Sequence, residues 1–115
     1  MSNDERRSHP RISVDLPLHL TFRDRTVETR IRDLSNSGIR FRGPAALPLL
    51  SRVQIALQLP EVPRSTTSSL AITGVVVRCE ETGDAGSGRY DTAIYFEDLS
   101  TSARAQLSQF VSTKN

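Results

Sequence analysis

The chain has 115 residues, a net charge of +2 and an apolar share of 37%. This length suits one domain with a modest core, and the apolar share is well above that of a disordered chain. One cysteine excludes an internal disulfide, and with only two histidines it leaves no cluster with metal-ligand spacing. No apolar run reaches membrane-spanning length and no hydrophobic signal segment is present, so we expect a cytoplasmic protein without a membrane segment.

Residues 1–11 are polar and charged, and they show no hydrophobic periodicity. We therefore predict a flexible N-terminal arm over 1–11, followed by a folded domain over 12–115. Pro10 disfavours a helical conformation at His9, so the arm is expected to be extended. In an extended chain Arg7 and Arg11 face the same way, about 13 Å apart. Two long side chains at that separation can bracket a ligand that has two bases or two phosphates.

The segment 12–22 carries an apolar residue at every second position, from Ile12 to Phe22. Strict alternation of this kind is typical of a half-buried strand. Further strands are predicted at 26–33, 39–43, 52–59, 70–81 and 89–98, with turn-forming segments between them. The strand at 70–81 is apolar on both faces near Val75 to Val77, which favours a central position in a sheet.

From Leu99 to Val111 the apolar residues recur at a spacing of three and four, which indicates an amphipathic helix. Ser100 is the expected N-cap of this helix. Six short strands at regular spacing favour a closed antiparallel barrel or a sandwich. We expect the C-terminal helix to pack on the sheet or to plug one end of it.

Motifs of catalysis are missing from the sequence. It has no phosphate-binding loop of the Walker type, no Gly-x-Ser-x-Gly and no histidine–carboxylate pair at helical spacing. His19 is predicted to lie on the solvent face of the first strand, and Cys79 reads as a small residue of the fifth strand. The expectation is a protein that is not an enzyme and has no cofactor or bound metal.

The second strand leads into the stretch Asp33-x-Ser35-x-x-Gly38, a pattern expected by chance in roughly 0.04 copies at this composition. Its residue types are those of a turn. If Leu34 faces the core, Asp33 and Ser35 both point outward on one face of the sheet. Gly38 would then adopt a positive φ angle and let the backbone approach a ligand closely.

An exposed carboxylate accepts two parallel hydrogen bonds, and the Watson–Crick edge of guanine offers two adjacent N–H donors. Arginine recognises the other edge of guanine through O6 and N7, and it also forks onto phosphate. Of the 15 basic residues, Lys114 is the only lysine, so 14 are arginines. A carboxylate, a hydroxyl and paired arginines can together bind a guanine nucleotide without a strongly basic surface.

The two motifs together resemble the signature of the PilZ domain family, bacterial receptor modules for cyclic di-GMP. That signature is an R-x-x-x-R arm followed by a D/N-x-S-x-x-G turn in a six-stranded barrel. Here the matching stretches are "RSHPR" from Arg7 to Arg11 and "DLSNSG" from Asp33 to Gly38, and "GIRF", "GVVVR" and "TAIYFEDLS" are also similar. The resemblance implies a six-stranded antiparallel β-barrel with a C-terminal amphipathic helix.

The resemblance also implies roles for single residues. Arg7 and Arg11 would clamp the guanines and phosphates of cyclic di-GMP, and Asp33 would bind the guanine Watson–Crick edge. Ser35 would contact phosphate or base, and Gly38 would leave room for the ligand.

Three further positions depend on the resemblance alone. Arg6 stands before the arm motif, where arginine in the family is associated with two stacked ligand molecules, so we expect two cyclic di-GMP molecules per chain. Arg78 is a further candidate for stacking on a base. Ala93 replaces a glycine that many relatives have in the last strand, a change expected to lie away from the site.

The leading hypothesis is a stand-alone cyclic di-GMP receptor that passes its signal to an unidentified protein partner. One alternative is a PilZ-like interaction module that binds no nucleotide. Another is a small arginine-rich barrel for single-stranded nucleic acid, but such barrels need exposed aromatic side chains. Phe22, Phe41, Phe96 and Phe110 occupy inward positions of the pattern, so DNA and RNA are not the expected partners.

Overall fold

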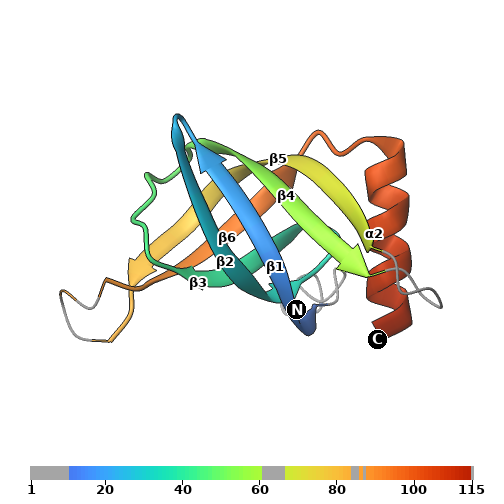
Figure 1. The fold of residues 1–115 in the computed structure, drawn as a ribbon, viewed down its shortest axis with the longest axis horizontal. Coiled ribbons are helices and arrows are strands. Elements are labelled where there is room, and N and C mark those ends of the chain that lie inside the picture. Colours follow the sequence, from blue (N-terminus) through green and yellow to red (C-terminus); the bar gives the residue numbers. More distant parts are fainter. Residues whose placement is uncertain (1–10, 61–66, 84–85, 87, 115) are drawn as a thin grey trace, which may run out of the picture.

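The computed structural model describes residues 11–60, 67–83, 86 and 88–114. Within these ranges the chain forms six strands and one helix (Figure 1). These elements are β1 (Ile12–Phe22), β2 (Arg25–Leu34), β3 (Gly38–Gly43), β4 (Arg52–Pro60), β5 (Thr67–Glu81), β6 (Tyr90–Glu97) and α2 (Thr101–Lys114).

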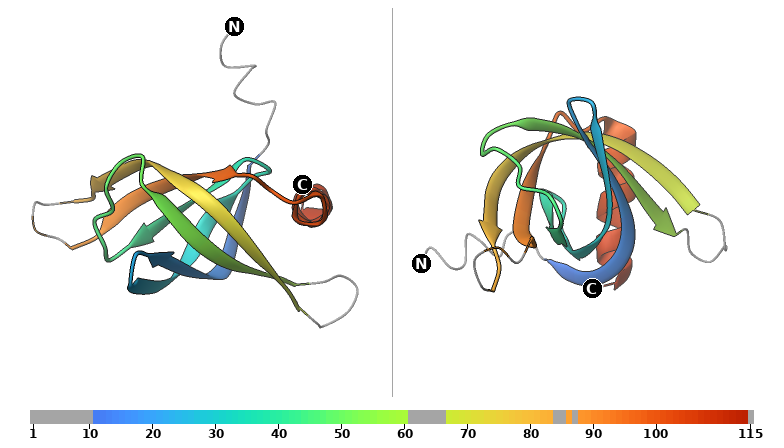
Figure 2. Two further views of the ribbon diagram at one scale, coloured as in Figure 1. Left: turned by 90° about the horizontal axis from the view of Figure 1, so that it is seen from above. Right: turned by 60° about the vertical axis from the view of Figure 1, so that its left-hand side comes forward.

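All neighbouring strands are antiparallel, and they close into a barrel in the order β1-β2-β3-β6-β5-β4, with β4 returning to β1. The views in Figure 2 show the strands wrapped around a common interior. The fold predicted from the sequence is therefore confirmed as a closed six-stranded barrel with a C-terminal helix. The pairing of β3 with β6 brings together segments that are distant in the sequence, such as Gly38 and Tyr95.

The barrel interior is filled by the apolar residues that alternate along the strands. Leu18 and Leu20 of β1, Leu57 of β4 and Val76 of β5 have almost no exposed surface. Outward neighbours such as His19, Thr21 and Gln58 are polar, as expected for strands with one face on the core and one in water. This tight packing fixes which residues point outward, and the candidate site is built on that outer wall.

Three irregularities in strand pairing change the direction of side chains on this wall. The β1–β2 register shifts between Ser13 and Leu16, and the β2–β3 register shifts between Ile31 and Asp33. The β5–β6 register shifts between Val76 and Arg78. A β-bulge inserts an unpaired residue and re-aims its neighbours, and bulges are frequent beside binding sites.

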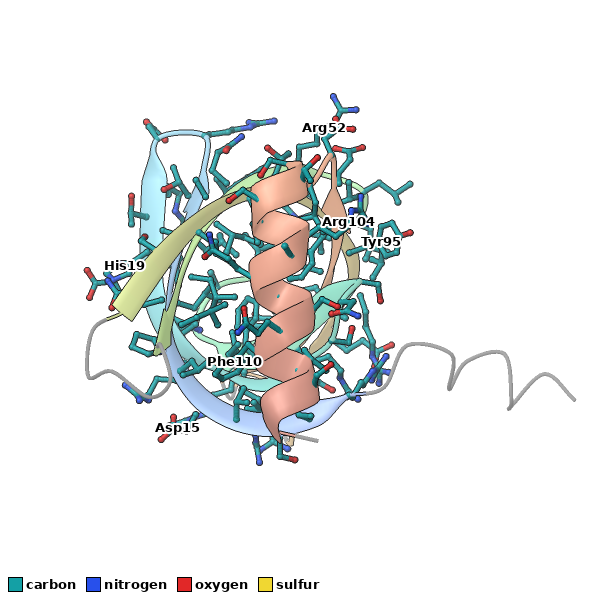
Figure 3. All side chains as sticks on the ribbon, turned by 90° about the vertical axis from the view of Figure 1, so that its right-hand side faces the viewer. Asp15, His19, Arg52, Tyr95, Arg104 and Phe110 are labelled. Atoms are coloured by element: carbon teal, nitrogen blue, oxygen red, sulfur yellow. The ribbon has the colours of Figure 1, made fainter. Side chains whose placement is uncertain are left out.

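The helix α2 covers one end of the barrel (Figure 3). Its buried residues Ala103, Leu107, Phe110 and Val111 join the apolar core of the strands. Ser100 caps the helix, because its Oγ accepts a hydrogen bond from the Ala103 amide at 3.0 Å. Two predictions are thereby confirmed: Ser100 as the N-cap, and a C-terminal helix at one end of the barrel. Among the described residues, no helix is long and apolar enough to span a membrane.

Candidate functional site

The turn between β2 and β3 is held by Ser35, whose side chain is only 4% exposed. Its Oγ accepts hydrogen bonds from the amides of Ser37 and Gly38, both at 3.2 Å. The Ser35 amide in turn donates to the Gly38 carbonyl at 3.0 Å. The prediction that Ser35 points outward is therefore wrong, because its hydroxyl replaces a strand partner for two amides inside the turn.

Gly38 is required by a close backbone approach and not by a positive φ angle, which corrects the prediction from the sequence. The glycines with positive φ in the described chain are Gly83, Gly86 and Gly88. A Cβ on Gly38 would stand 2.3 Å from the carbonyl oxygen of Ile94, which no real contact allows. Glycine thus lets the turn lie directly against β6, next to Tyr95, its register partner.

Asp33 follows the bulge in β2 and faces Arg40 across the β2–β3 pair. Leu34 is fully buried, so the Asp33 side chain is turned to the outer wall, where it is half-buried. Within the part of the chain that the structure describes, its carboxylate has no hydrogen bond and no ion pair. A half-buried carboxylate without a partner is well suited to accept hydrogen bonds from a ligand.

A pocket on the outer wall collects the described residues of both motifs. Arg11, Asp33, Ser35 and Gly38 all line it. Arg11 is exposed, and among the described residues its guanidinium has no ion-pair partner. The structure therefore brings together four of the seven residues proposed from the sequence, at one place between β2, β3 and β6.

The sequence analysis missed several residues of this pocket: Arg40, Val77, Ala93 and Tyr95. Tyr95 is 57% exposed and Val77 is 51% exposed, so they present apolar surface to solvent (Figure 3 labels Tyr95). Alternation with Ile94 and Phe96 indicates that Tyr95 points outward, but only the β3–β6 pairing places it beside Gly38. Val77 is exposed because it is the extra residue of the bulge in β5.

The prediction that Ala93 lies away from the site is wrong, because Ala93 lines the pocket. It is paired with Arg40 of β3 on one side and with Arg78 of β5 on the other. A glycine at this position would leave one methyl group less in the pocket. The substitution therefore bears on the shape of the site.

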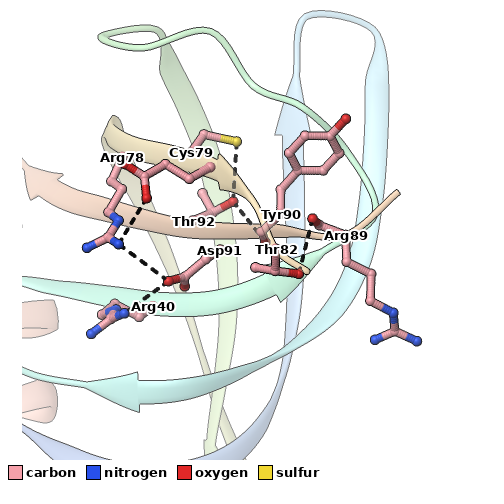
Figure 4. Close-up of polar contacts among 9 residues, drawn as sticks. Arg40, Arg78, Cys79, Thr82, Arg89, Tyr90, Asp91 and Thr92 are labelled. Atoms are coloured by element: carbon pink, nitrogen blue, oxygen red, sulfur yellow. Dashed lines mark hydrogen bonds and ion pairs between the residues drawn. The ribbon is translucent and has the colours of Figure 1, made fainter. Parts of the chain in front are cut away.

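Arg78 belongs to an ion-pair network beside the pocket and is not among the residues that line it (Figure 4). Its guanidinium lies 3.0 Å from Glu80 and 4.0 Å from Asp91. Asp91 also binds Arg40 at 3.1 Å. One carboxylate thus orients two arginines at the edge of the site.

Arg6 and Arg7 lie outside the described residues, as does the predicted arm up to Pro10. In the described ranges, no group of three or more histidine, cysteine, aspartate or glutamate side chains has an arrangement that could hold a metal ion. The site is therefore described by Arg11 and by the residues of the barrel wall.

The geometry defines a small β-barrel domain with a pocket on its outer wall that combines charged groups with apolar surface. The family model of the PilZ domain matches residues 5–113. The chain belongs to the PilZ domain family. The resemblance inferred from its two motifs is thereby confirmed.

Solved structures with the same fold include the inhibitor of motility MotI/DgrA of Bacillus subtilis, at a TM-score of 0.78 and 16% identity. Escherichia coli YcgR in complex with c-di-GMP has a TM-score of 0.71 and 18% identity. The isolated PilZ domain of YcgR with c-di-GMP has a TM-score of 0.68 and 18% identity. At these identities the likeness shows the fold alone.

The coverage of these structures is uneven. The alignments include 93% of this chain with MotI/DgrA, 94% with YcgR and 95% with the isolated domain. They include 50% of MotI/DgrA, 45% of YcgR and 91% of the isolated YcgR domain. The chain therefore spans about half the length of the first two proteins. No curated protein matches the sequence.

Proposed function

We propose that this PilZ domain is a receptor for cyclic di-GMP, which it binds between its N-terminal arm and the turn from Asp33 to Gly38. The observation that carries the proposal is the Asp33 carboxylate, half-buried in the pocket and without a partner among the described residues. Two adjacent N–H donors on a guanine edge satisfy such a carboxylate with two parallel hydrogen bonds.

Arg11 supplies the opposite kind of group at the same pocket. Its guanidinium forks onto a phosphate or onto O6 and N7 of guanine. The arginine expected next to it in the bound state is Arg7, from the arm outside the described residues. The exposed faces of Val77 and Tyr95 offer apolar surface to a base plane. Ser35 contributes by holding the turn that positions Asp33 and Gly38.

We infer a receptor because the pocket offers groups that recognise a nucleotide: a carboxylate, guanidinium groups and apolar surface. A bound ligand alters the outer wall and orders the arm, and the resulting surface is what a downstream protein partner would recognise. The family relation and the c-di-GMP complexes of YcgR support this reading.

A thermal shift experiment tests the proposal. At a ligand concentration a hundred times its dissociation constant, binding to the folded state alone adds about 2.7 kcal/mol to the free energy of unfolding. We expect the melting temperature to rise with cyclic di-GMP and to stay unchanged with a single-stranded oligonucleotide. An interaction module without nucleotide binding would respond to neither. A rise with the oligonucleotide alone would favour the nucleic-acid-binding barrel.

A further inference from the structure

A second groove continues the outer wall beyond the candidate pocket. Arg32, Arg40 and Arg42 line it together with Asp33 and Asp91. It shares Asp33 and Arg40 with the candidate pocket, so the two hollows adjoin. Of these three arginines, Arg40 belongs to the ion-pair network with Asp91 and Arg78, and Arg32 and Arg42 do not.

Strand geometry explains why Arg32 and Arg42 line the same groove. Arg32 is the bulge residue of β2, between the pairs Ile31–Phe41 and Asp33–Arg40. Arg42 follows Phe41 directly in β3, and it is paired with Asp91 of β6. The bulge therefore places the exposed Arg32 and Arg42 within one residue of the same cross-strand pair.

The groove carries the guanidinium groups of Arg32, Arg40 and Arg42 against the carboxylates of Asp33 and Asp91. Asp91 is already engaged by Arg40 at 3.1 Å, with Arg78 at 4.0 Å. Among the described residues, the guanidinium groups of Arg32 and Arg42 have neither an ion pair nor a side-chain hydrogen bond.

Arg30, two residues before Arg32 on the same strand, has partners of its own. On β2, Arg30 binds Asp15 of β1 through both its carboxylate and its carbonyl oxygen. Guanidinium groups without such a partner are available to donate hydrogen bonds to an anion in the groove.

We propose that this groove is a phosphate-binding subsite in which Arg32 and Arg42 fork onto the oxygens of a phosphate group. Arginine pairs recognise phosphate through parallel N–H···O hydrogen bonds, and the groove is open enough to admit one. Two sources offer this chemistry. One is a phosphodiester of cyclic di-GMP that extends from the adjoining pocket, and this source rests on the proposed function. The other is a phosphate-bearing ligand that binds independently of it.

The first arm of the test uses inorganic phosphate on the ligand-free protein. The arginine Nε–H resonances are followed by NMR in the wild type, in Arg32→Gln/Arg42→Gln and in Arg23→Gln/Arg25→Gln. The last variant removes the same charge from the β1–β2 hairpin tip. We expect a saturable shift of the Arg32 and Arg42 resonances, retained in the hairpin variant. Shifts that rise linearly with ionic strength at all arginines count against the subsite.

The second arm titrates cyclic di-GMP into the same three proteins by calorimetry. If the phosphate comes from the dinucleotide, Arg32→Gln/Arg42→Gln weakens binding about tenfold or removes one bound molecule, and the hairpin variant does neither. If the wild type shows the saturable phosphate shift while the groove variant binds cyclic di-GMP as the wild type does, the source is a separate ligand. The proposal is overturned if the wild type shows no saturable shift of the Arg32 and Arg42 resonances and the groove variant binds cyclic di-GMP as the wild type does. A wild type that responds to phosphate but not to cyclic di-GMP refutes the proposed function and leaves the subsite standing.

Discussion

At the scale of single residues, Asp33 separates ligand binding from folding. Its carboxylate contributes no described hydrogen bond or ion pair to the barrel, so Asp33→Ala should hardly move the melting temperature of the ligand-free protein. It should weaken cyclic di-GMP binding by about 1–3 kcal/mol or more, because two guanine donors lose their acceptor. Calorimetry measures the loss, and Asp24→Ala on the exposed hairpin tip is the matched control. Wild-type affinity in Asp33→Ala would remove this carboxylate from the site.

In contrast to Asp33, Gly38 is expected to matter for folding, since its substitution should damage the turn itself. In Gly38→Ala the new methyl group meets the Ile94 carbonyl oxygen at 2.3 Å, and the turn must move away from β6. Overpacking of this kind costs about 1–3 kcal/mol of unfolding free energy. The local marker is the Phe96 amide, which donates to the Ser37 carbonyl at 2.8 Å and should lose protection from hydrogen exchange.

Gly83→Ala is the control for that experiment, because Gly83 has a positive φ but open space around its Cβ position. It should lower stability through backbone strain while leaving exchange at Phe96 unchanged. Equal protection of Phe96 in the wild type and in Gly38→Ala would contradict the close-approach explanation.

Single residues also show which features of the site could be predicted from the sequence and which could not. Asp33, Ser35 and Gly38 were identified from their spacing, and the structure places all three at one pocket. The spacing carries no information about Ile94, which lies some sixty residues further along the chain. The reason for glycine, a carbonyl of another strand, was therefore not accessible from the motif.

At the scale of elements, alternation predicted every strand, and the deviations lie at the ends. The second strand was expected at 26–33 and forms Arg25–Leu34, and the fifth was expected at 70–81 and forms Thr67–Glu81. Strand ends depend on pairing with neighbours, which a local pattern does not contain. The same limit explains the missed Tyr95 and Val77, since the first needs the β3–β6 pairing and the second needs a bulge.

The helix cap gives a prediction at this scale. Removing the Ser100 hydroxyl leaves the Ala103 amide without its acceptor, so Ser100→Ala should cost about 1 kcal/mol. For a domain of this size the melting temperature falls by about 4 °C. Ser112→Ala, at an exposed position near the other end of α2, should leave it unchanged. An equal fall of the melting temperature in Ser100→Ala and Ser112→Ala would mean that the cap contributes nothing specific.

The arm provides a second prediction for an element. Arg7 and Arg11 are proposed to contact the ligand, so amide exchange across residues 4–11 should be slower with cyclic di-GMP than without it. Fixing each residue costs about 1–2 kcal/mol of conformational entropy, which the arginine contacts must offset. Exchange measured by mass spectrometry on the corresponding peptide gives the comparison, and the peptide of β4 serves as reference. Identical exchange in both states would argue against closure of the arm.

At the scale of the whole molecule, the open question is how many ligand molecules the site holds. Arg6 neighbours Arg7, and in an extended arm the two side chains project to opposite sides. We expect two cyclic di-GMP molecules per chain in the wild type and one in Arg6→Leu, with measurable affinity retained. Calorimetric stoichiometry provides the count, and Arg25→Leu controls for the lost charge. An unchanged count in Arg6→Leu would leave Arg6 as a solvated charge.

The proposed subsite at Arg32 and Arg42 lies on the same outer wall as the candidate pocket, so it bears on the number of cyclic di-GMP molecules bound per chain. Both Arg11 and this groove offer cations near the pocket that contains Asp33. If each contacts a different phosphate, the Arg6 and Arg32/Arg42 variants should weaken binding additively, as independent sites do. The wall of β2, β3 and β6 would then act as one extended nucleotide surface.

Cyclic di-GMP is proposed to bind at the pocket between Arg11 and the turn from Asp33 to Gly38. A titration of ¹⁵N-labelled protein with cyclic di-GMP, followed through the backbone amide resonances, tests both binding and place. We predict saturable shifts concentrated at residues 33–40 and 93–95, with the buried face of α2 around Leu107 unperturbed. Absence of saturable shifts, or shifts confined to surfaces away from β2, β3 and β6, would contradict the claim.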